Sequence, residues 1–297
     1  MAVPILQHET AARSNTFIAN EPCAIDELVS EDEPEVLNFL AVRPLHTVVM
    51  ASMIRDNGVV SPQNRGSFYA CRTAQGELEG VALVGHVTVI EARTETALST
   101  FARLTRHCLN THLVRGERET IQRFWSYYAN AGQEPRRISR ELLVEQREAF
   151  PSLEPVADLR RATLGDLDQV LQINSAMAFQ EGGTSPLNRD PGGFRHRTAR
   201  RIEQNRVWVW VSEGRLIFKA DIIAETPDVA YLEGVYVHAE ERMKGYGRRC
   251  LTQLGRTLLT RNKSICLTIN QENKKALAFY TKAGYQLHSD YETIYLR

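Results

Sequence analysis

The alternation of apolar and polar positions in the second half of the chain predicts helices and strands in turn. Apolar residues recur at helical spacing at Leu164, Leu167 and Val170, which predicts an opening helix. Three strand-like runs follow, and a Glu-Gly turn joins the first two. A helix from about 246 to 259, a short buried strand, a helix stopped by Gly284 and one or two closing strands complete this half. The four internal strand-like runs cover 206–212, 215–225, 229–238 and 264–270.

The first half shows a similar order of elements. We expect helices at 31–42, 45–58, 94–109 and 119–132, and strands at 66–75, 78–92, 111–116 and 139–146. The repetition predicts an α+β (mixed α/β) protein with two copies of one fold, each a mixed, mostly antiparallel sheet flanked by helices.

A proline-rich segment separates the two halves. Pro151 and Pro155 forbid a continuous helix between them. We therefore expect a flexible arm at 1–22, a first domain at 23–150 and a second domain at 151–297.

Composition narrows the classes of partner. The 297 residues are 43% apolar, which is enough for two cores. Lys plus Arg and Asp plus Glu each number 36, so the whole chain has no net charge to attract nucleic acid or an anionic membrane. No apolar run reaches the roughly 18 to 20 residues of a membrane span, and the N-terminus lacks a secretory signal pattern. We expect a cytoplasmic protein with neither partner.

The five cysteines are scattered and form no Cys-x-x-Cys pair. This pattern favours reduced thiols in the core over disulfides or zinc ligands. We therefore expect no metal site.

Residues 242–247, Arg-Met-Lys-Gly-Tyr-Gly, stand where the third strand of the second half gives way to a helix. The unpaired N–H groups and the dipole of a helix start attract anions, and the two glycines would let the backbone approach a phosphate closely. The loop therefore predicts a pyrophosphate site, although a plain glycine turn among solvated arginines is the alternative. The corresponding stretch of the first half, 90–98, contains no glycine. The cations that would supply charge are Arg242, Lys244, Arg248 and Arg249.

The loop and a later segment together resemble a known family. "VYVHAEERMKGYG" (235–247) is similar to the acyl-CoA-binding motif of the GNAT superfamily of N-acetyltransferases, Q/R-x-x-G-x-G/A after a valine-rich strand. "NQENKKALAFYTKAGYQ" (270–286) resembles the second motif of that family. The resemblance covers roughly 157–297, and the first half resembles the fold only in element order. It implies a tandem GNAT protein with an intact second domain and a degenerate first one.

The resemblance implies acetyl-CoA as the cofactor. The valines of the central strand could equally be core residues, and Asn273 is also a plausible N-cap of its helix. The residues that the resemblance assigns to the coenzyme are Val235, Tyr236, Val237, Arg242, Met243, Lys244, Gly245, Tyr246, Gly247, Arg248, Asn270, Asn273 and Tyr280.

Direct acetyl transfer needs an unprotonated amine, stabilisation of an oxyanion and a proton for the departing thiolate. Tyr280 is the candidate general acid, with packing on its helix as the alternative. Glu233 is the candidate general base, because strict alternation would place it on one strand face with Tyr231, Val235 and Val237. A solvated or ion-paired Glu233 is the alternative.

The acceptor side is less well marked by the sequence. The candidate pocket residues are Phe179, Glu181 and Trp210, although Trp210 could equally be core. The cations between Arg189 and Arg206 are candidates for binding an acidic acceptor or the coenzyme's 3′-phosphate, but such a helix is more often a solvated face.

Three functions compete at this stage. The first is an N-acetyltransferase that moves acetyl from acetyl-CoA to a small-molecule or peptide primary amine, in a ternary complex and without a covalent enzyme intermediate. The second is an acyl-CoA-binding regulatory module with little turnover. The third, a nucleic-acid-binding protein, is disfavoured by the zero net charge. The sequence leaves the acceptor and the oligomeric state open, a homodimer included.

Overall fold

The computed structural model describes residues 24–151, 154–183 and 185–296. Within this part of the chain twelve strands pair into one sheet in the order β1-β2-β3-β4-β5-β12-β6-β11-β10-β9-β8-β7. Most neighbours are antiparallel, and β4–β5 and β10–β11 are parallel. The mixed, mostly antiparallel sheet flanked by helices confirms the predicted fold class. The arm expected at 1–22 lies outside the described residues.

The first half follows the predicted order with two differences: β1 was not predicted, and the single run expected at 78–92 is two strands that turn at His86. Its elements are β1 (Ala24–Glu27), α1 (Glu33–Leu40), α2 (Pro44–Asn57), β2 (Gly66–Arg72), β3 (Leu78–Gly85), β4 (Val87–Ala92), α3 (Glu95–Arg106), β5 (Leu113–Glu117), α4 (Arg118–Tyr128) and β6 (Arg137–Gln146).

The second half also follows the prediction, with the short strand β7 and the short helix α6 in addition. Its elements are β7 (Arg160–Arg161), α5 (Leu167–Gly182), α6 (Pro186–Arg189), α7 (Pro191–Glu203), β8 (Val207–Ser212), β9 (Arg215–Glu225), β10 (Val229–Val237), α8 (Tyr246–Leu258), β11 (Ser264–Asn270), α9 (Lys274–Lys282) and β12 (Gln286–Tyr295).

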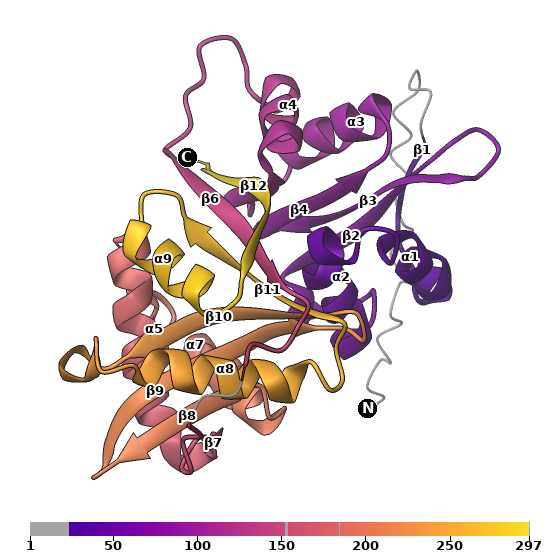
Figure 1. The fold of residues 1–297 in the computed structure, drawn as a ribbon. Helices are drawn as coiled ribbons and strands as arrows, with labels where there is room; N and C mark the ends of the chain where they lie inside the picture. The colour runs from indigo at the N-terminus through magenta and orange to yellow at the C-terminus, as the bar shows by residue number, and fades with distance from the viewer. Residues whose placement is uncertain (1–23, 152–153, 184, 297) are drawn as a thin grey trace, which may run out of the picture.

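The two halves exchange their last strands. β6 of the first half pairs with β11 and β12 of the second, and β12 in turn pairs with β5 and β6. Figure 1 shows the magenta β6 running between the gold and yellow strands β11 and β12. The exchange leaves no open sheet edge between the halves, where an unpaired strand would expose its backbone groups. The sequence predicted one sheet in each half, whereas the exchange merges the two, and the division at 150/151 stays a prediction.

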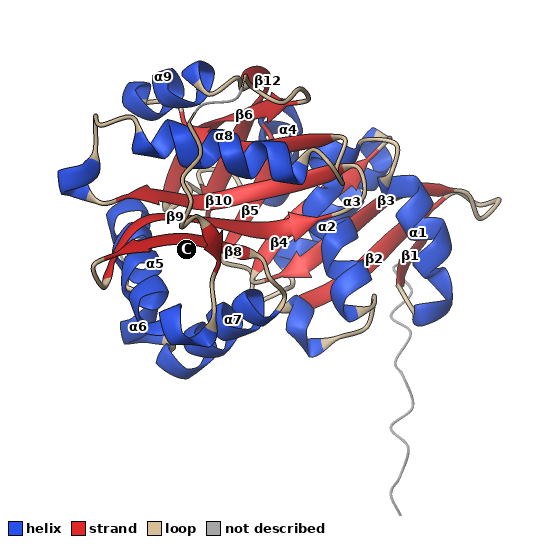
Figure 2. Cartoon of the chain, turned by 60° about the horizontal axis from the view of Figure 1, so that its bottom comes forward, coloured by secondary structure: helices blue, strands red, loops and turns tan. Residues whose placement is uncertain are grey.

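Helices cover both faces of this sheet. Along β11, Ile265 and Leu267 pack in the core under α8 and α9, whereas Cys266 packs with Leu45 and Val48 of α2 on the opposite face. Figure 2 shows α8 and α9 on one side of the sheet and α5, α6 and α7 on the other. We call these the α8 face and the α5 face. Any site between the strands of the second half is therefore enclosed from two sides.

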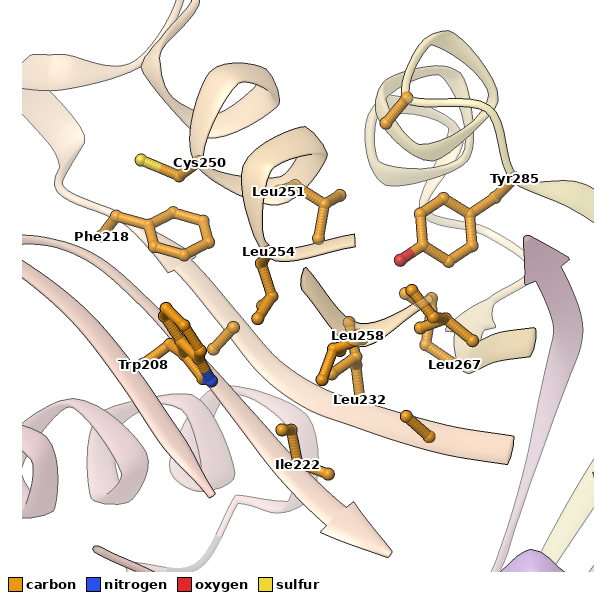
Figure 3. Close-up of a cluster of buried hydrophobic side chains, with 14 of the residues drawn as sticks. Trp208, Phe218, Ile222, Leu232, Cys250, Leu251, Leu254, Leu258, Leu267 and Tyr285 are labelled. Atoms are coloured by element: carbon orange, nitrogen blue, oxygen red, sulfur yellow. The ribbon is translucent and has the colours of Figure 1, made fainter. Parts of the chain in front are cut away.

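The buried stripe of α8 fixes the helix to the sheet. Cys250, Leu251, Leu254 and Leu258 are buried on one side of α8 and belong to one core cluster with Trp208, Phe218 and Leu232 of the strands (Figure 3). Each fully buried leucine contributes about 1.5–3 kcal/mol. The first turn of α8 is consequently held at a set place relative to β10.

This packing predicts a large loss of stability for Leu254→Ala. The substitution leaves a cavity among fully buried side chains, so we expect the free energy of unfolding to fall by about 2–5 kcal/mol. Arg256→Ala, an exposed position on the same helix, should change it by less than about 0.5 kcal/mol. Urea denaturation of both variants measures the difference, and equal losses would contradict the assignment of the stripe.

The cysteines differ in part from the expectation. Cys108, Cys250 and Cys266 are free thiols, as predicted. Cys71 is disulfide-bonded, so the expectation of reduced thiols throughout is wrong for that residue. Because Cys71 lies alone within a β-strand, its spacing in the sequence gave no signal of pairing.

The sequence predicted neither a membrane-spanning helix nor a metal site. None of the described helices has the length and apolarity that crossing a membrane requires. Within the same ranges, no group of three or more His, Cys, Asp or Glu side chains is arranged to hold a metal ion.

Candidate active site

Gly245 starts α8 and requires glycine for its backbone conformation. It is the N-cap residue with φ of +83°, a left-handed conformation that side chains disfavour, and the space around an added Cβ is open. No side chain caps the helix. Among the described residues, none accepts a hydrogen bond from the backbone N–H groups of residues 243–248. The amides at this helix start are therefore available to an anion.

Gly247 serves the packing of the helix. An added Cβ would lie 2.8 Å from Cγ2 of Val237 and 3.3 Å from the Phe279 ring. The glycine thus allows α8 to approach β10 and α9. The expectation was that Gly247 makes room for a phosphate, but its Cβ position faces protein rather than the loop. Close packing of the helix is therefore what requires glycine at this position.

The side chains around the loop are partly engaged with the protein. Nε of Arg242 donates to the carbonyl oxygen of Val237 at 3.1 Å, and Lys244 forms an ion pair with Glu241 at 3.0 Å. Arg249 donates to the carbonyl oxygen of Glu154 at 2.9 Å, which ties the helix to the segment between the halves. Arg248 is exposed and has no ion-pair partner among the described residues, which leaves its guanidinium for a ligand.

Three further expected residues lie around this loop. Met243 is fully exposed, with a left-handed φ of 64°. Tyr246 packs edge-on against Trp210, with ring centroids 5.0 Å apart. Trp210 therefore lies on the α8 face beside the loop and packs against the core, which favours its core interpretation over a place in the acceptor pocket.

The strands β10 and β11 form a fork. They pair only over Val229–Tyr231 and Ser264–Cys266 and then diverge. Beyond Tyr231, β10 keeps β9 on one side, and none of the described strands pairs with it on the other. The backbone of Val235, Tyr236 and Val237 thus borders an open strand edge that leads to the loop, as a paired extended ligand would need.

A bulge at Gly234 reverses the faces of β10. Gly234 has φ of +60°, and the register with β9 shifts between Glu233 and Tyr236. Val235 and Val237 therefore pack on the α8 face, whereas Tyr236 joins the core under α5 and α7. The prediction that Glu233 shares a face with Val235 and Val237 is wrong, because the bulge inserts a residue into the alternation.

Glu233 instead lies on the α5 face, together with Glu181 from the end of α5. Both side chains are exposed, and none of the described residues forms an ion pair with either. Partial burial raises the pKa of Glu181, and the charges of Glu233 and Glu141 act in the same direction. The charges of Arg115 and Arg137 oppose this rise in the pKa. The structure thus brings two of the predicted site carboxylates together.

Tyr280 lies on α9, and its ring contacts two neighbouring aromatic rings. Its ring packs edge-on with Phe279 at 5.1 Å and with Tyr285 at 5.6 Å. Burial raises the pKa of the Tyr280 phenol, and the charge of Glu181 adds to the rise. The phenol therefore keeps its proton at neutral pH and is within electrostatic reach of Glu181 across the fork.

Asn270 and Asn273 serve local structure. Oδ1 of Asn273 accepts the N–H of Ala276 at 3.0 Å, so the N-cap interpretation of Asn273 is confirmed. Oδ1 of Asn270 accepts the N–H of Glu272 at 2.9 Å. Nδ2 of Asn270 also donates to Oγ of Ser139 at 3.5 Å. Phe179, 57% exposed on α5, is the remaining predicted pocket residue.

A buried ion pair under the bulge was not predicted from the sequence. Nζ of Lys219 on β9 donates to Asp221 at 2.7 Å, and Asp221 also accepts from Asn174 of α5 at 3.2 Å and Arg201 of α7 at 3.3 Å. An added Cβ on Gly234 would lie 2.8 Å from Nζ of Lys219. A lysine and an aspartate two residues apart within an apolar run were the signal that could have found this pair.

Comparison with known proteins decides the family of the second half. Residues 168–285 match the model of the acetyltransferase (GNAT) family. This part of the chain is a GNAT domain. A search of curated proteins gives no match.

The likeness in fold extends beyond the GNAT domain to both halves. An acetyltransferase of the GNAT family from Colwellia psychrerythraea superposes with a TM-score of 0.58 at 12% identity, covering 92% of this chain and 100% of that one. A Drosophila protein gives 0.62 at 13% identity, covering 94% and 99%. A tandem GNAT protein from the clavulanic acid biosynthesis pathway gives 0.57 at 13% identity, covering 92% and 98%. These similarities show a shared fold over both halves, and the assignment of the first half as a degenerate GNAT domain stays a prediction.

In the first half, α3 stands at the place that corresponds to α8, and a side chain caps its start. Thr94 caps α3 by accepting the N–H of Ala97 at 3.2 Å, and Glu95 adds negative charge in the first turn. Arg93 stacks over the Phe39 ring at 4.0 Å. A capped, acidic helix start disfavours an anion, which supports a single coenzyme loop in the described chain.

Proposed function

We propose that the GNAT domain binds acetyl-CoA and transfers its acetyl group to a primary amine by direct attack. The open edge of β10 beyond Tyr231, together with the uncapped start of α8 that follows β10 in the chain, carries this proposal. Glu233 approaches the same fork from the α5 face, and Tyr280 approaches it from the α8 face.

The residues fit the coenzyme by charge and by shape. The amides of residues 243–248 and the guanidinium of Arg248 would hold the pyrophosphate. The open space at Gly245 admits it. The backbone at Val235–Val237 would pair with the extended pantetheine arm, and the side-chain amides of Asn270 and Asn273 would add polar contacts.

Bound acetyl-CoA would supply the acetyl group as an activated thioester. Glu233 takes the proton of the attacking amine, directly or through a water. Backbone N–H groups on the free edge of β10 stabilise the developing oxyanion. Tyr280 gives its proton to the departing thiolate, which its raised pKa permits because the phenol is protonated beforehand.

The acceptor is a small-molecule or peptide amine that reaches the fork beside Glu181 and Glu233. Two neighbouring carboxylates without ion-pair partners among the described residues favour a cationic amine over an acidic acceptor. The second candidate, an acyl-CoA-binding module with little turnover, differs in one respect: it would release no thiol when amine is added.

Calorimetric titration with acetyl-CoA tests the coenzyme site. Gly245→Glu should weaken binding at least about 10-fold, because a carboxylate then faces the phosphates. Gly214→Glu is the matched control, since Gly214 also has a left-handed φ of +75° and open space around its Cβ. Equal affinities of the two variants would refute the coenzyme loop.

Thiol release tests transfer. Wild-type protein is incubated with acetyl-CoA and, separately, an alkyl diamine, an amino-sugar and a lysine-containing peptide. Amine-dependent thiol release is the expected result. Tight coenzyme binding without release for any amine would favour the regulatory module.

A further inference from the structure

Arg115 links the first half to the fork of the second. It lies on β5, and its terminal nitrogen Nη2 donates to the Tyr231 hydroxyl at 2.8 Å and to the Thr268 hydroxyl at 2.6 Å. The same nitrogen lies 3.0 Å from Oε2 of Glu141. One guanidinium thus joins four strands, β5, β6, β10 and β11.

These contacts gather at the vertex of the fork. Tyr231 is the last residue of β10 that pairs with β11, and Thr268 lies on β11 just beyond that pairing. Their hydroxyls are 3.0 Å apart, so the two strands are joined by side chains where their backbones separate. In the sheet order, β12, β6 and β11 stand between β5 and β10, and the contact of Arg115 with Tyr231 therefore requires the sheet to curve toward the α5 face.

The vertex is well shielded from water. The side chains of Arg115 and Glu141 are 22% and 15% exposed, and Tyr231 is buried. Charge-assisted hydrogen bonds in such surroundings hold their geometry more strongly than exposed ones. Glu233 follows Tyr231 by two residues on the same strand face, before the bulge. The position of Glu233 consequently depends on where Arg115 holds Tyr231.

We propose that Arg115 is a positioning residue for acyl transfer, supplied by the first half to the active cleft of the GNAT domain through Tyr231 and Thr268. This inference rests on the function proposed above. The first half, which lacks a coenzyme loop, would thereby take part in the reaction by completing the acceptor side of the fork.

The charge of Arg115 acts on the same cleft. The groups that face Glu181 are Glu233 of β10, Glu141 and Arg137 of β6, Arg115 of β5 and Tyr280 of α9. Arg115 and Arg137 favour the ionised form of Glu181, whereas the two glutamates disfavour it. Removal of Arg115 therefore makes Glu181 harder to ionise.

Three variants separate positioning from simple support. Arg115→Met removes both the hydrogen bonds and the charge, Thr268→Val removes one acceptor and keeps the charge, and Arg115→Lys keeps the charge with a different geometry. Asp56→Asn is the matched control. Asp56 of α2 also joins the halves, through an ion pair with Arg206 at 2.5 Å, and its side chain is 23% exposed.

The assay uses acetyl-CoA and whichever amine of the panel gives the fastest thiol release. We expect Arg115→Met to lower kcat/KM for the amine about 10- to 100-fold, as small displacements of reacting groups do. Its affinity for acetyl-CoA should stay within about twofold of wild type. The acidic limb of the pH profile should move to higher pH by up to about one unit. Thr268→Val should lower kcat/KM without shifting the acidic limb of the pH profile. Arg115→Lys should bring that limb back toward its wild-type position more fully than it restores kcat/KM.

Asp56→Asn should lower stability while leaving kcat/KM and the pH profile unchanged. The positioning role is overturned if Arg115→Met likewise lowers stability and leaves the kinetics unchanged. It is also overturned if Arg115→Met does not fold while the folded variants Thr268→Val and Arg115→Lys match wild-type kinetics. Failure of wild type to bind acetyl-CoA or release thiol is a different result, which overturns the proposed function and this role with it.

Discussion

Tyr280→Phe is expected to lower kcat by about 10²- to 10⁴-fold, the range that a positioned general acid contributes. The substitution keeps the ring, its edge-on contacts with Phe279 and Tyr285 and the packing of α9, and removes only the proton donor. The affinity for acetyl-CoA should change little. Steady-state thiol release with the panel's fastest amine, together with calorimetry, measures both quantities.

Tyr285→Phe provides the matched control. Tyr285 is the neighbouring ring, it is buried, and its hydroxyl has no hydrogen-bond partner among the described residues. Loss of an unsatisfied hydroxyl should leave kcat unchanged and stability equal or slightly higher. If Tyr280→Phe retains the wild-type kcat, Tyr280 packs only and the general acid lies elsewhere.

Asp221→Asn is expected to lower the free energy of unfolding by about 3–5 kcal/mol, because it leaves the charge of Lys219 buried without its partner. Lys219 is fully buried, and Asp221 is the acceptor of its hydrogen bond. The loss should loosen the bulge at Gly234 as well, since Nζ of Lys219 lies directly behind it. Urea denaturation gives the magnitude.

The pH dependence of this variant has a definite sign. Burial lowers the pKa of Lys219 in the folded protein, and the charge of Asp221 opposes the shift. Without Asp221 the folded pKa falls further below the unfolded value of about 10.4. Between these two values the unfolded state binds more protons, so stability rises with pH, by up to about 1.4 kcal/mol per unit for one group.

The stability of Asp221→Asn should therefore recover as the pH is raised from 7 toward 9, more steeply than that of wild type. Lys219→Met/Asp221→Leu removes both charges and should regain most of the lost stability. A variant whose stability is independent of pH in this range would show that Lys219 is not the charge responsible.

Local patterns in the sequence determined the elements and the glycine loop at the start of α8. The helix expected at about 246–259 is α8, and the three strand-like runs before it are β8, β9 and β10. These features depend on neighbours within a few residues: apolar spacing for the elements, and the backbone freedom of glycine at 245 for the loop. The same locality explains why the two motifs sufficed to identify a GNAT domain.

Only the tertiary structure decided how the halves are joined and which groups share the fork. The exchange of β6 and β12 depends on pairing between strands more than a hundred residues apart in the chain, and alternation along a single strand contains no information about it. The bulge at Gly234 put Val235 and Val237 on the face opposite to Glu233, and a curved sheet brought Arg115 to Tyr231. The sequence by itself determined the glycine loop proposed to bind the coenzyme and the candidate acid, because those signals are local. The composition of the acceptor side was decided by contacts that form only when both halves fold onto one sheet.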